Sequence, residues 1–270
     1  MNPSSRKSSS WKELGLPNKI IRALRRSSLS HPTPVQQRSL PYGLTGRDFV
    51  AVAPAGTGKT LAYLLPLWTS LDSSQIRALI LIPTRELAFQ VSRMLRELNP
   101  KLHQDCLVIV GGHGIKRQAQ KLRGGWKVLI ATPGRLLDFL HRDASLLSMV
   151  RLLVLDEFDK LLKLGFREQI KQIRRLIPGR IHTMWLSATE PDKKDIAGSL
   201  RRAVRINLAA GKKTGSCEEL SGRGRCREPS GGGLCGRQGV VPQMPIRACR
   251  DSVQLVCRAD NHHRSVSDAW

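Results

Sequence analysis

The sequence contains few acidic residues and no long hydrophobic run. Asp and Glu number 21 against 45 Lys and Arg, so the formal net charge is +24. No apolar stretch approaches the roughly 18–20 residues that a membrane-spanning helix requires. The Ser-rich N-terminus MNPSSRKSSS lacks the hydrophobic segment of a secretory signal. We therefore expect an intracellular protein, in the cytoplasm, nucleus or nucleolus, with no membrane segment.

The excess of positive charge favours an anionic partner. A surplus of this size is typical of proteins that contact nucleic acid or an acidic membrane surface, although an inert basic surface is also compatible with it. Composition alone leaves these alternatives open.

Seven short apolar segments alternate with longer amphipathic ones, such as residues 61–71 and 86–98. This alternation predicts an α/β fold with a central parallel sheet flanked by helices, because strands buried on both faces form continuous apolar runs. Residues 12–29 predict two short helices ahead of the sheet. The expected strands are 48–53, 78–82, 106–110, 127–131, 151–156, 182–187 and 203–208.

The pattern ends near residue 210. Residues 211–270 hold nine of the 23 Gly and five of the six Cys, with no periodicity of 2 or 3.6. We expect a disordered N-terminus over 1–10, one folded domain over 11–210, and a Gly/Arg/Cys-rich, disordered tail over 211–270. A zinc module is the alternative for the tail, but its cysteines form no C-x₂₋₄-C pair.

The stretch VAVAPAGTGKTLAYLLPL places a loop of small residues between an expected strand and an expected helix. Glycines there let backbone N–H groups surround phosphate oxygens, and the helix N-terminus favours the same anion. Lys59 is expected to reach the β- and γ-phosphates and the Thr60 hydroxyl to bind Mg²⁺. The sequence therefore predicts a nucleotide-binding phosphate loop, formed by Ala55, Gly56, Thr57, Gly58, Lys59 and Thr60.

The run RLLVLDEFDK predicts a second part of the same site. Asp156 and Glu157 follow an apolar strand, and sites in open parallel sheets form at the carboxyl ends of strands. Asp156 suits Mg²⁺, directly or through water, and Glu157 suits a general base that activates the attacking water. Lys59, Asp156 and Glu157 are therefore the candidate catalytic residues.

Several motifs in one order resemble the first RecA-like domain of the DEAD-box ATP-dependent RNA helicases. The resemblance covers residues 11–208. Its motifs are Trp11, PTPVQ at 32–36, APAGTGKT at 53–60, PTREL at 83–87, Gly111-Gly112, TPGR at 132–135, DEFD at 156–159 and SAT at 187–189.

The resemblance implies roles for residues outside the phosphate loop. Gln36 would read the adenine edge of ATP and Trp11 would stack on the base. Ser187 and Thr189 would hydrogen-bond near Asp159 and couple the nucleotide state to RNA. Sequence-independent contacts to the backbone of single-stranded RNA would come from Thr84, Arg85, Gly112, Thr132 and Arg135.

Two features depart from the family pattern. Phe158 stands where the family has Ala, and the bulkier ring needs a neighbouring gap. No HRxGRxGR-type motif of a second RecA-like domain follows residue 210. The expected function is RNA-stimulated ATP hydrolysis by a truncated RNA helicase; the alternative is an impaired nucleotide- and RNA-binding module. A further alternative, a P-loop small-molecule kinase, has in common with this sequence only the phosphate loop and the carboxylates.

Overall fold

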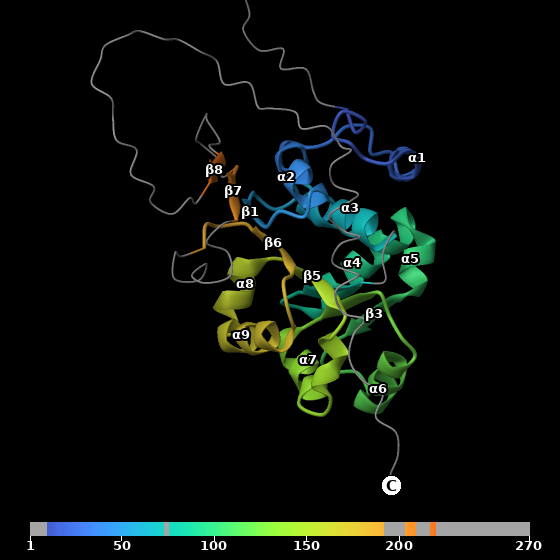
Figure 1. Ribbon diagram of the computed structural model, residues 1–270, viewed down its shortest axis with the longest axis vertical. Coiled ribbons are helices and arrows are strands. Elements are labelled where there is room, and N and C mark those ends of the chain that lie inside the picture. The colour runs from blue at the N-terminus through green and yellow to red at the C-terminus, as the bar shows by residue number, and fades with distance from the viewer. Residues whose placement is uncertain (1–9, 73–75, 192–202, 209–216, 220–270) are drawn as a thin grey trace, which may run out of the picture. The chain divides into compact units, whose positions relative to one another are not determined.

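The computed structural model describes residues 10–72, 76–191, 203–208 and 217–219 (Figure 1). These residues belong to one compact unit that ends at Gly222. The helices are α1 Asn18–Arg26, α2 Pro34–Leu44, α3 Lys59–Asp72, α4 Arg85–Leu98, α5 Pro100–Gln104, α6 Ile115–Arg123, α7 Pro133–Leu140, the 3₁₀ helix η1 Ala144–Leu147, α8 Phe158–Lys163 and α9 Arg167–Leu176. The strands are β1 Phe49–Val52, β2 Arg77–Leu81, β3 Cys106–Ile109, β4 Val128–Ala131, β5 Val150–Leu155, β6 His182–Ser187, β7 Val204–Asn207 and β8 Cys217–Glu219.

The strands form one sheet in the order β3-β4-β2-β5-β6-β1-β7-β8. All neighbours from β3 to β7 pair in parallel, and β8 pairs antiparallel with β7. The seven strands predicted from apolar runs are confirmed with ends shifted by at most one residue. Strand β8 lies beyond residue 210, where the sequence predicted none. The rest of the predicted tail and the predicted disorder of residues 1–9 lie outside the described residues.

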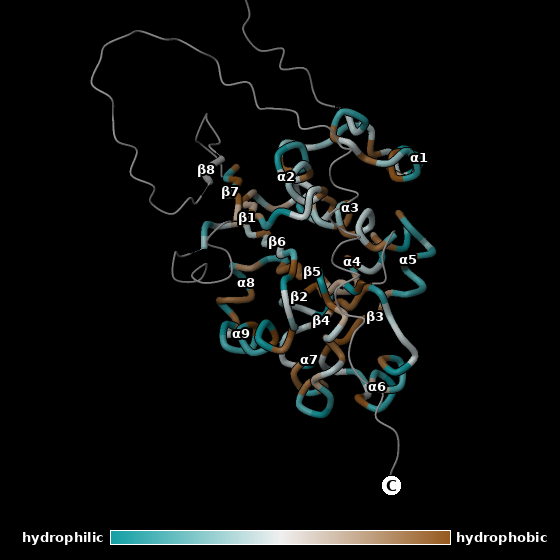
Figure 2. The backbone as a smooth tube through the Cα atoms, in the orientation of Figure 1, coloured by the Kyte–Doolittle hydropathy of each residue, from teal (hydrophilic) through white to brown (hydrophobic). Residues whose placement is uncertain are grey.

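Alternate residues of each strand face opposite sides of the sheet, and each side is covered by its own helices (Figure 1). In β2, Ala78 and Ile80 pack in the cluster that includes α1 to α5, whereas Leu79 and Leu81 pack in the cluster that includes α6 to α9. Figure 2 shows the hydrophobic colouring concentrated on the strands and the hydrophilic colouring on outer helices such as α6 and α9. Burial on both faces explains the continuous apolar runs.

The segment ahead of the sheet differs from the prediction. Residues 11–15 form turns, and of the two helices predicted over 12–29 only α1 is present. Gly15 has a φ of 77° and Pro17 stands at the N-cap, so the chain begins its helix only at Asn18. The second helix before the sheet is α2, which starts after Thr33 in a capping box with Gln36.

Candidate nucleotide and nucleic-acid site

The sequence-predicted motifs meet at one edge of the sheet because parallel strands end on the same side. Adjacent strands β1, β6 and β5 lead into the phosphate loop, SAT and DEFD. Strands β2, β4 and β3 lead into PTREL, TPGR and the Gly111-Gly112 pair. The strand order therefore divides this edge into two halves, which meet where β5 pairs with β2 and which we call the nucleotide half and the nucleic-acid half after the ligands predicted for their motifs.

Gln36 links the segment before the sheet to the phosphate loop. Its Oε1 accepts from the Thr33 backbone N–H at 2.8 Å, and its Nε2 donates to the Gly58 carbonyl at 2.9 Å. Gly58 has a φ of 89°, and a Cβ there would overlap the Gln36 amide, so this approach requires glycine. With 1% of its surface exposed, Gln36 has to become more accessible before it can contact an adenine edge, for which its amide keeps a second N–H and a second oxygen lone pair.

Lys59 is folded back onto the phosphate loop. Its Nζ donates to the carbonyls of Ala53 at 2.6 Å and Pro54 at 3.0 Å, while Thr57 Oγ1 also donates to Pro54. Burial lowers the Lys59 pKa, and attraction to Asp156 opposes that shift. The two carbonyls take the hydrogen bonds that phosphate oxygens would accept from this ammonium group.

Asp156 is the buried carboxylate of the nucleotide half, with 7% of its surface exposed. Its Oδ1 accepts from the Glu157 N–H at 2.9 Å, and its Oδ2 accepts from the Tyr63 hydroxyl at 2.8 Å. Burial raises its pKa to about 6, and the two hydrogen bonds act in the opposite direction. The sequence did not indicate a role for Tyr63 at this site, because an aromatic residue within LAYLLPL is typical of a hydrophobic core.

Glu157 occupies an unusual backbone conformation at the start of α8. Its φ of 49° and ψ of 50° are left-handed, a conformation that costs a non-glycine residue energy and is often found at functional sites. Its Oε2 lies 2.9 Å from Lys160 Nζ, which orients the carboxylate. The side chain is partly buried, with 23% of its surface exposed.

Phe158 fits because the fold provides an aromatic partner. Its ring centroid lies 4.1 Å from that of Trp185 on β6, and both residues are buried in the cluster that includes α6 to α9. The gap required by the bulkier residue is therefore present beneath DEFD.

The hydrogen bonds predicted between DEFD and SAT are present. Asp159 Oδ1 accepts from Ser187 Oγ at 3.1 Å and from the Ala188 N–H at 3.3 Å, and Oδ2 accepts from Thr189 Oγ1 at 3.3 Å. Burial alone would raise the Asp159 pKa, but these donors hold it below its usual value. This carboxylate is therefore ionised and links α8 to the end of β6.

The nucleic-acid half brings three predicted RNA-contacting residues together. Gly112 has a φ of 77°, and a Cβ there would overlap the Arg85 guanidinium. Arg135 Nη1 donates to the His113 carbonyl at 3.3 Å. Thr84 caps α4, because its Oγ1 accepts from the Leu87 N–H at 3.4 Å. The remaining predicted residue, Thr132, is the N-cap of α7.

The other predicted nucleotide contacts differ in exposure. Ala55 and Gly56 are exposed at the tip of the phosphate loop, and Thr60 is half-buried in the first turn of α3. Trp11 has only 4% of its surface exposed, and its indole N–H donates to the Leu29 carbonyl at 2.9 Å. The Trp11 ring therefore fastens the segment ahead of α1 to the core in this conformation.

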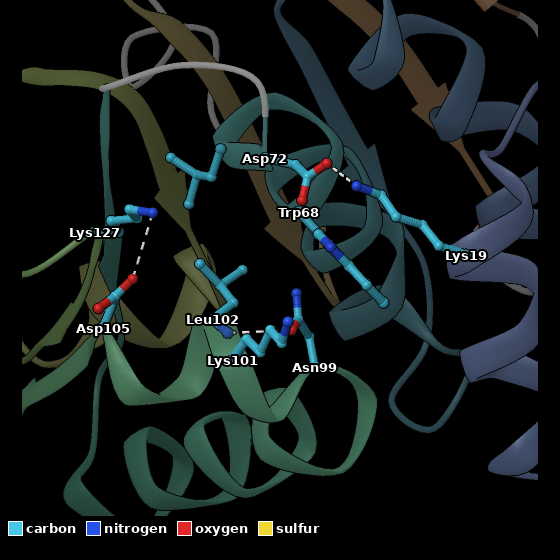
Figure 3. A pocket seen from close by; sticks show the side chains of 9 residues that line it. Lys19, Trp68, Asp72, Asn99, Lys101, Leu102, Asp105 and Lys127 are labelled. Carbon is cyan, nitrogen blue, oxygen red and sulfur yellow. Dashed lines mark hydrogen bonds and ion pairs between the residues drawn. The ribbon is translucent and has the colours of Figure 1, made fainter.

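A cavity of about 380 Å³ lies at the opposite edge of the sheet. Figure 3 shows its two ion pairs, Lys19 with Asp72 and Lys127 with Asp105, and Trp68 beside them. Helix α3 runs from the phosphate loop to this cavity over 14 residues, or about 21 Å. Because lysines neutralise both carboxylates, the cavity has neither the charge nor the position of the nucleotide site.

The described ranges contain no cluster of three His, Cys, Asp or Glu residues placed to share a metal ion. Mg²⁺ does not need such a cluster, since it commonly takes one or two carboxylates together with substrate phosphates and water. The Asp156 carboxylate and the Thr60 hydroxyl fit that donor set. Four of the five cysteines of the tail, on which the alternative of a zinc module depends, lie outside the described residues.

In the described ranges, no helix has the length and hydrophobicity to cross a membrane.

Comparisons with known proteins place the same region in one family. A family model described as DEAD/DEAH box helicase matches residues 33–196. The chain is 40% identical over 184 residues to the ATP-dependent RNA helicase CshA of Listeria monocytogenes. The aligned segment covers 67% of this chain and 35% of CshA. It is 34% identical over 203 residues to the DEAD-box ATP-dependent RNA helicase RhpA of Helicobacter pylori. That alignment covers 74% of this chain and 41% of RhpA.

Solved structures agree. The yeast DEAD-box splicing factor Prp28 superimposes with a TM-score of 0.65 at 31% identity, over 80% of this chain and 54% of that one. A hypothetical ATP-dependent RNA helicase from Sulfolobus tokodaii gives a TM-score of 0.65 at 30% identity, over 72% of this chain and 57% of that one. The predicted RecA-like fold is confirmed, and the chain spans less than half the length of CshA and RhpA.

Proposed function

The chain belongs to the DEAD/DEAH box helicase family, and on that premise we propose that it carries the ATP- and RNA-binding domain of an ATP-dependent RNA helicase. The observation that carries this proposal is the division of one sheet edge into two halves. The phosphate loop, the DEFD carboxylates and the SAT hydroxyls lie at the ends of β1, β5 and β6, and Arg85 and Arg135 follow β2 and β4. Asp159, at the start of α8, accepts a hydrogen bond from Ser187 at the end of β6.

ATP hydrolysis would use four residues of the nucleotide half. Lys59 leaves the carbonyls of Ala53 and Pro54 and binds the β- and γ-phosphates. Thr60 and Asp156 hold Mg²⁺, which supplies charge neutralisation at the phosphates when bound. Glu157 accepts a proton from the attacking water, in an orientation set by Lys160.

Adenine recognition would require a local rearrangement. Gln36 exchanges its bonds to Thr33 and Gly58 for the two hydrogen-bonding groups of the adenine edge. Trp11 turns a ring face toward the base from its place beside Leu29. Nucleotide binding would thereby release the phosphate loop from the segment ahead of the sheet.

RNA would be held by its sugar-phosphate backbone. Arg85 and Arg135 supply charge, while the Gly112 backbone and the Thr84 and Thr132 hydroxyls supply close polar contacts. Contacts of this kind position a strand without reading its sequence. The net charge of +24 favours the same ligand. A helicase of this class would act inside the cell, where ATP and RNA are found.

A second candidate function is binding without useful turnover. The sequence contains no HRxGRxGR-type motif, and the loss of such arginines costs on the order of 10³–10⁵ in rate. The test is steady-state ATP hydrolysis with and without single-stranded RNA, with Lys59→Ala as the blank. RNA-stimulated turnover above the blank supports the helicase, and nucleotide binding without turnover supports the binding module. Absence of nucleotide binding overturns both.

A further inference from the structure

Phe89 is the most exposed Phe, Tyr or Trp among the described residues, with 46% of its surface accessible. It lies in the first turns of α4, one helical turn after Arg85. Residues four apart lie on the same side of a helix, so the ring and the guanidinium group are neighbours. An aromatic ring is therefore exposed to solvent on the nucleic-acid half of the site.

The ring has a defined partner across the loop after β3. Phe89 and His113 have centroids 5.7 Å apart and planes inclined by 52°, a tilted aromatic contact. His113 is exposed, and its carbonyl accepts from Arg135 Nη1. The two rings thus form a small aromatic surface, which we call the Phe89–His113 shelf, with Arg85 and Arg135 beside it.

This combination matches the chemistry of a single-stranded nucleic acid. Aromatic rings stack on bases of any sequence, and adjoining guanidinium groups bind phosphates. A duplex cannot use the shelf, because its bases already stack on one another. Leu164, at 55% exposure, is an exposed apolar residue at the C-cap of α8, outside the segments that follow β2, β3 and β4, and serves as a control.

We propose that one base of a single-stranded RNA stacks on the Phe89–His113 shelf while Arg85 and Arg135 hold the neighbouring phosphates. The inference rests on the proposed RNA-binding function and adds a base contact to it. Stacking strength depends on ring size, so this position should favour purines over pyrimidines by a modest factor.

The first experiment measures binding of a fluorescent oligoribonucleotide to the full chain by anisotropy, over a range of salt concentrations. Phe89→Ala should raise Kd about tenfold, from the stacking energy of one base, while the slope of log Kd against log salt stays unchanged. Phe89→Tyr should restore affinity. Leu164→Ala should bind as the parent does, and all variants should keep their melting temperatures because both sites are exposed.

The second experiment separates stacking from a structural effect. A set of oligonucleotides, each with one abasic position, should reveal one position at which the parent loses about tenfold in affinity. Phe89→Ala should be insensitive to the missing base at that position. Equal weakening by Phe89→Ala on intact and abasic RNA would overturn the shelf.

The outcomes also separate this inference from the proposed function. If the parent chain binds RNA and Phe89→Ala binds it with the same Kd, the proposed base stacking on the shelf is wrong, and the proposed contacts to the RNA backbone are unaffected. If the folded parent binds ATP but no RNA at any salt concentration, the proposed RNA-binding function is wrong and the shelf falls with it.

Discussion

The Tyr63 hydroxyl donates a 2.8 Å hydrogen bond to Asp156 Oδ2, across 93 residues of sequence. Tyr63 is fully buried in α3, the helix that starts at the phosphate loop, and Asp156 directly follows β5. The bond therefore fixes the predicted metal-binding carboxylate relative to the helix that carries Lys59 and Thr60. Burial beside Asp156 raises the Tyr63 pKa well above its usual value, so the phenol stays protonated and remains a donor.

Tyr63→Phe tests this contact. The variant keeps the ring but leaves Oδ2 of a buried carboxylate without its donor, which should lower the free energy of unfolding by about 1–3 kcal/mol. Urea denaturation at pH 8 measures the loss. Equal stability of Tyr63→Phe and the parent would show that the hydrogen bond contributes nothing.

Tyr63 also illustrates which contacts cannot be predicted from the sequence alone. Apolar runs predict the seven parallel strands, and the spacing of APAGTGKT predicts the loop between β1 and α3. The Tyr63–Asp156 and Phe89–His113 pairs depend on which strands become neighbours, and local patterns do not carry that order. Helix α2 was not predicted because its apolar residues lack a clear helical period and because Pro41, a residue type that usually ends a helix, lies inside it.

Glu157→Gln separates binding from chemistry. The amide has the shape of the carboxylate but cannot accept the proton of the attacking water, so hydrolysis should fall by about 10²-fold or more. ATP affinity, measured by titration with a fluorescent nucleotide, should stay within about twofold of the parent, because Glu157 binds no phosphate in this proposal. Glu168→Gln, which removes an exposed carboxylate paired with Lys171 on α9, is the matched control. Unchanged turnover would show that Glu157 is not the base.

Arg135→Ala tests the proposed contacts to the sugar-phosphate backbone of RNA. Loss of one phosphate contact should weaken RNA binding by a similar factor for all sequences and reduce the salt slope by about 1. Arg25→Ala is the control of equal charge, since Arg25 is exposed on α1 and lines a groove beside the cavity at the opposite edge of the sheet. Anisotropy titrations with several oligoribonucleotides measure both quantities. A loss confined to one sequence would contradict recognition through the backbone.

His182 should make the stability of the domain depend on pH. It begins β6, where its Nε2 donates to the Arg47 carbonyl at 2.9 Å. Burial lowers its pKa below the usual value of about 6.5, and nearby Asp48 opposes that shift. Between the lowered pKa and about 6.5 the unfolded chain binds more protons than the folded one, so this contribution is complete above about pH 6.5 and lost as the pH falls.

His182→Gln isolates this contribution, because the glutamine amide can donate to the same carbonyl but does not titrate. The urea midpoint of the parent should fall more between pH 8 and pH 5.5 than that of the variant, and the two should differ least at pH 8. The comparison between the two proteins removes the opposite contribution of Asp156, whose raised pKa of about 6 favours folding as the pH falls. Identical changes in midpoint would mean that His182 accepts a proton in the folded state as readily as in the unfolded one.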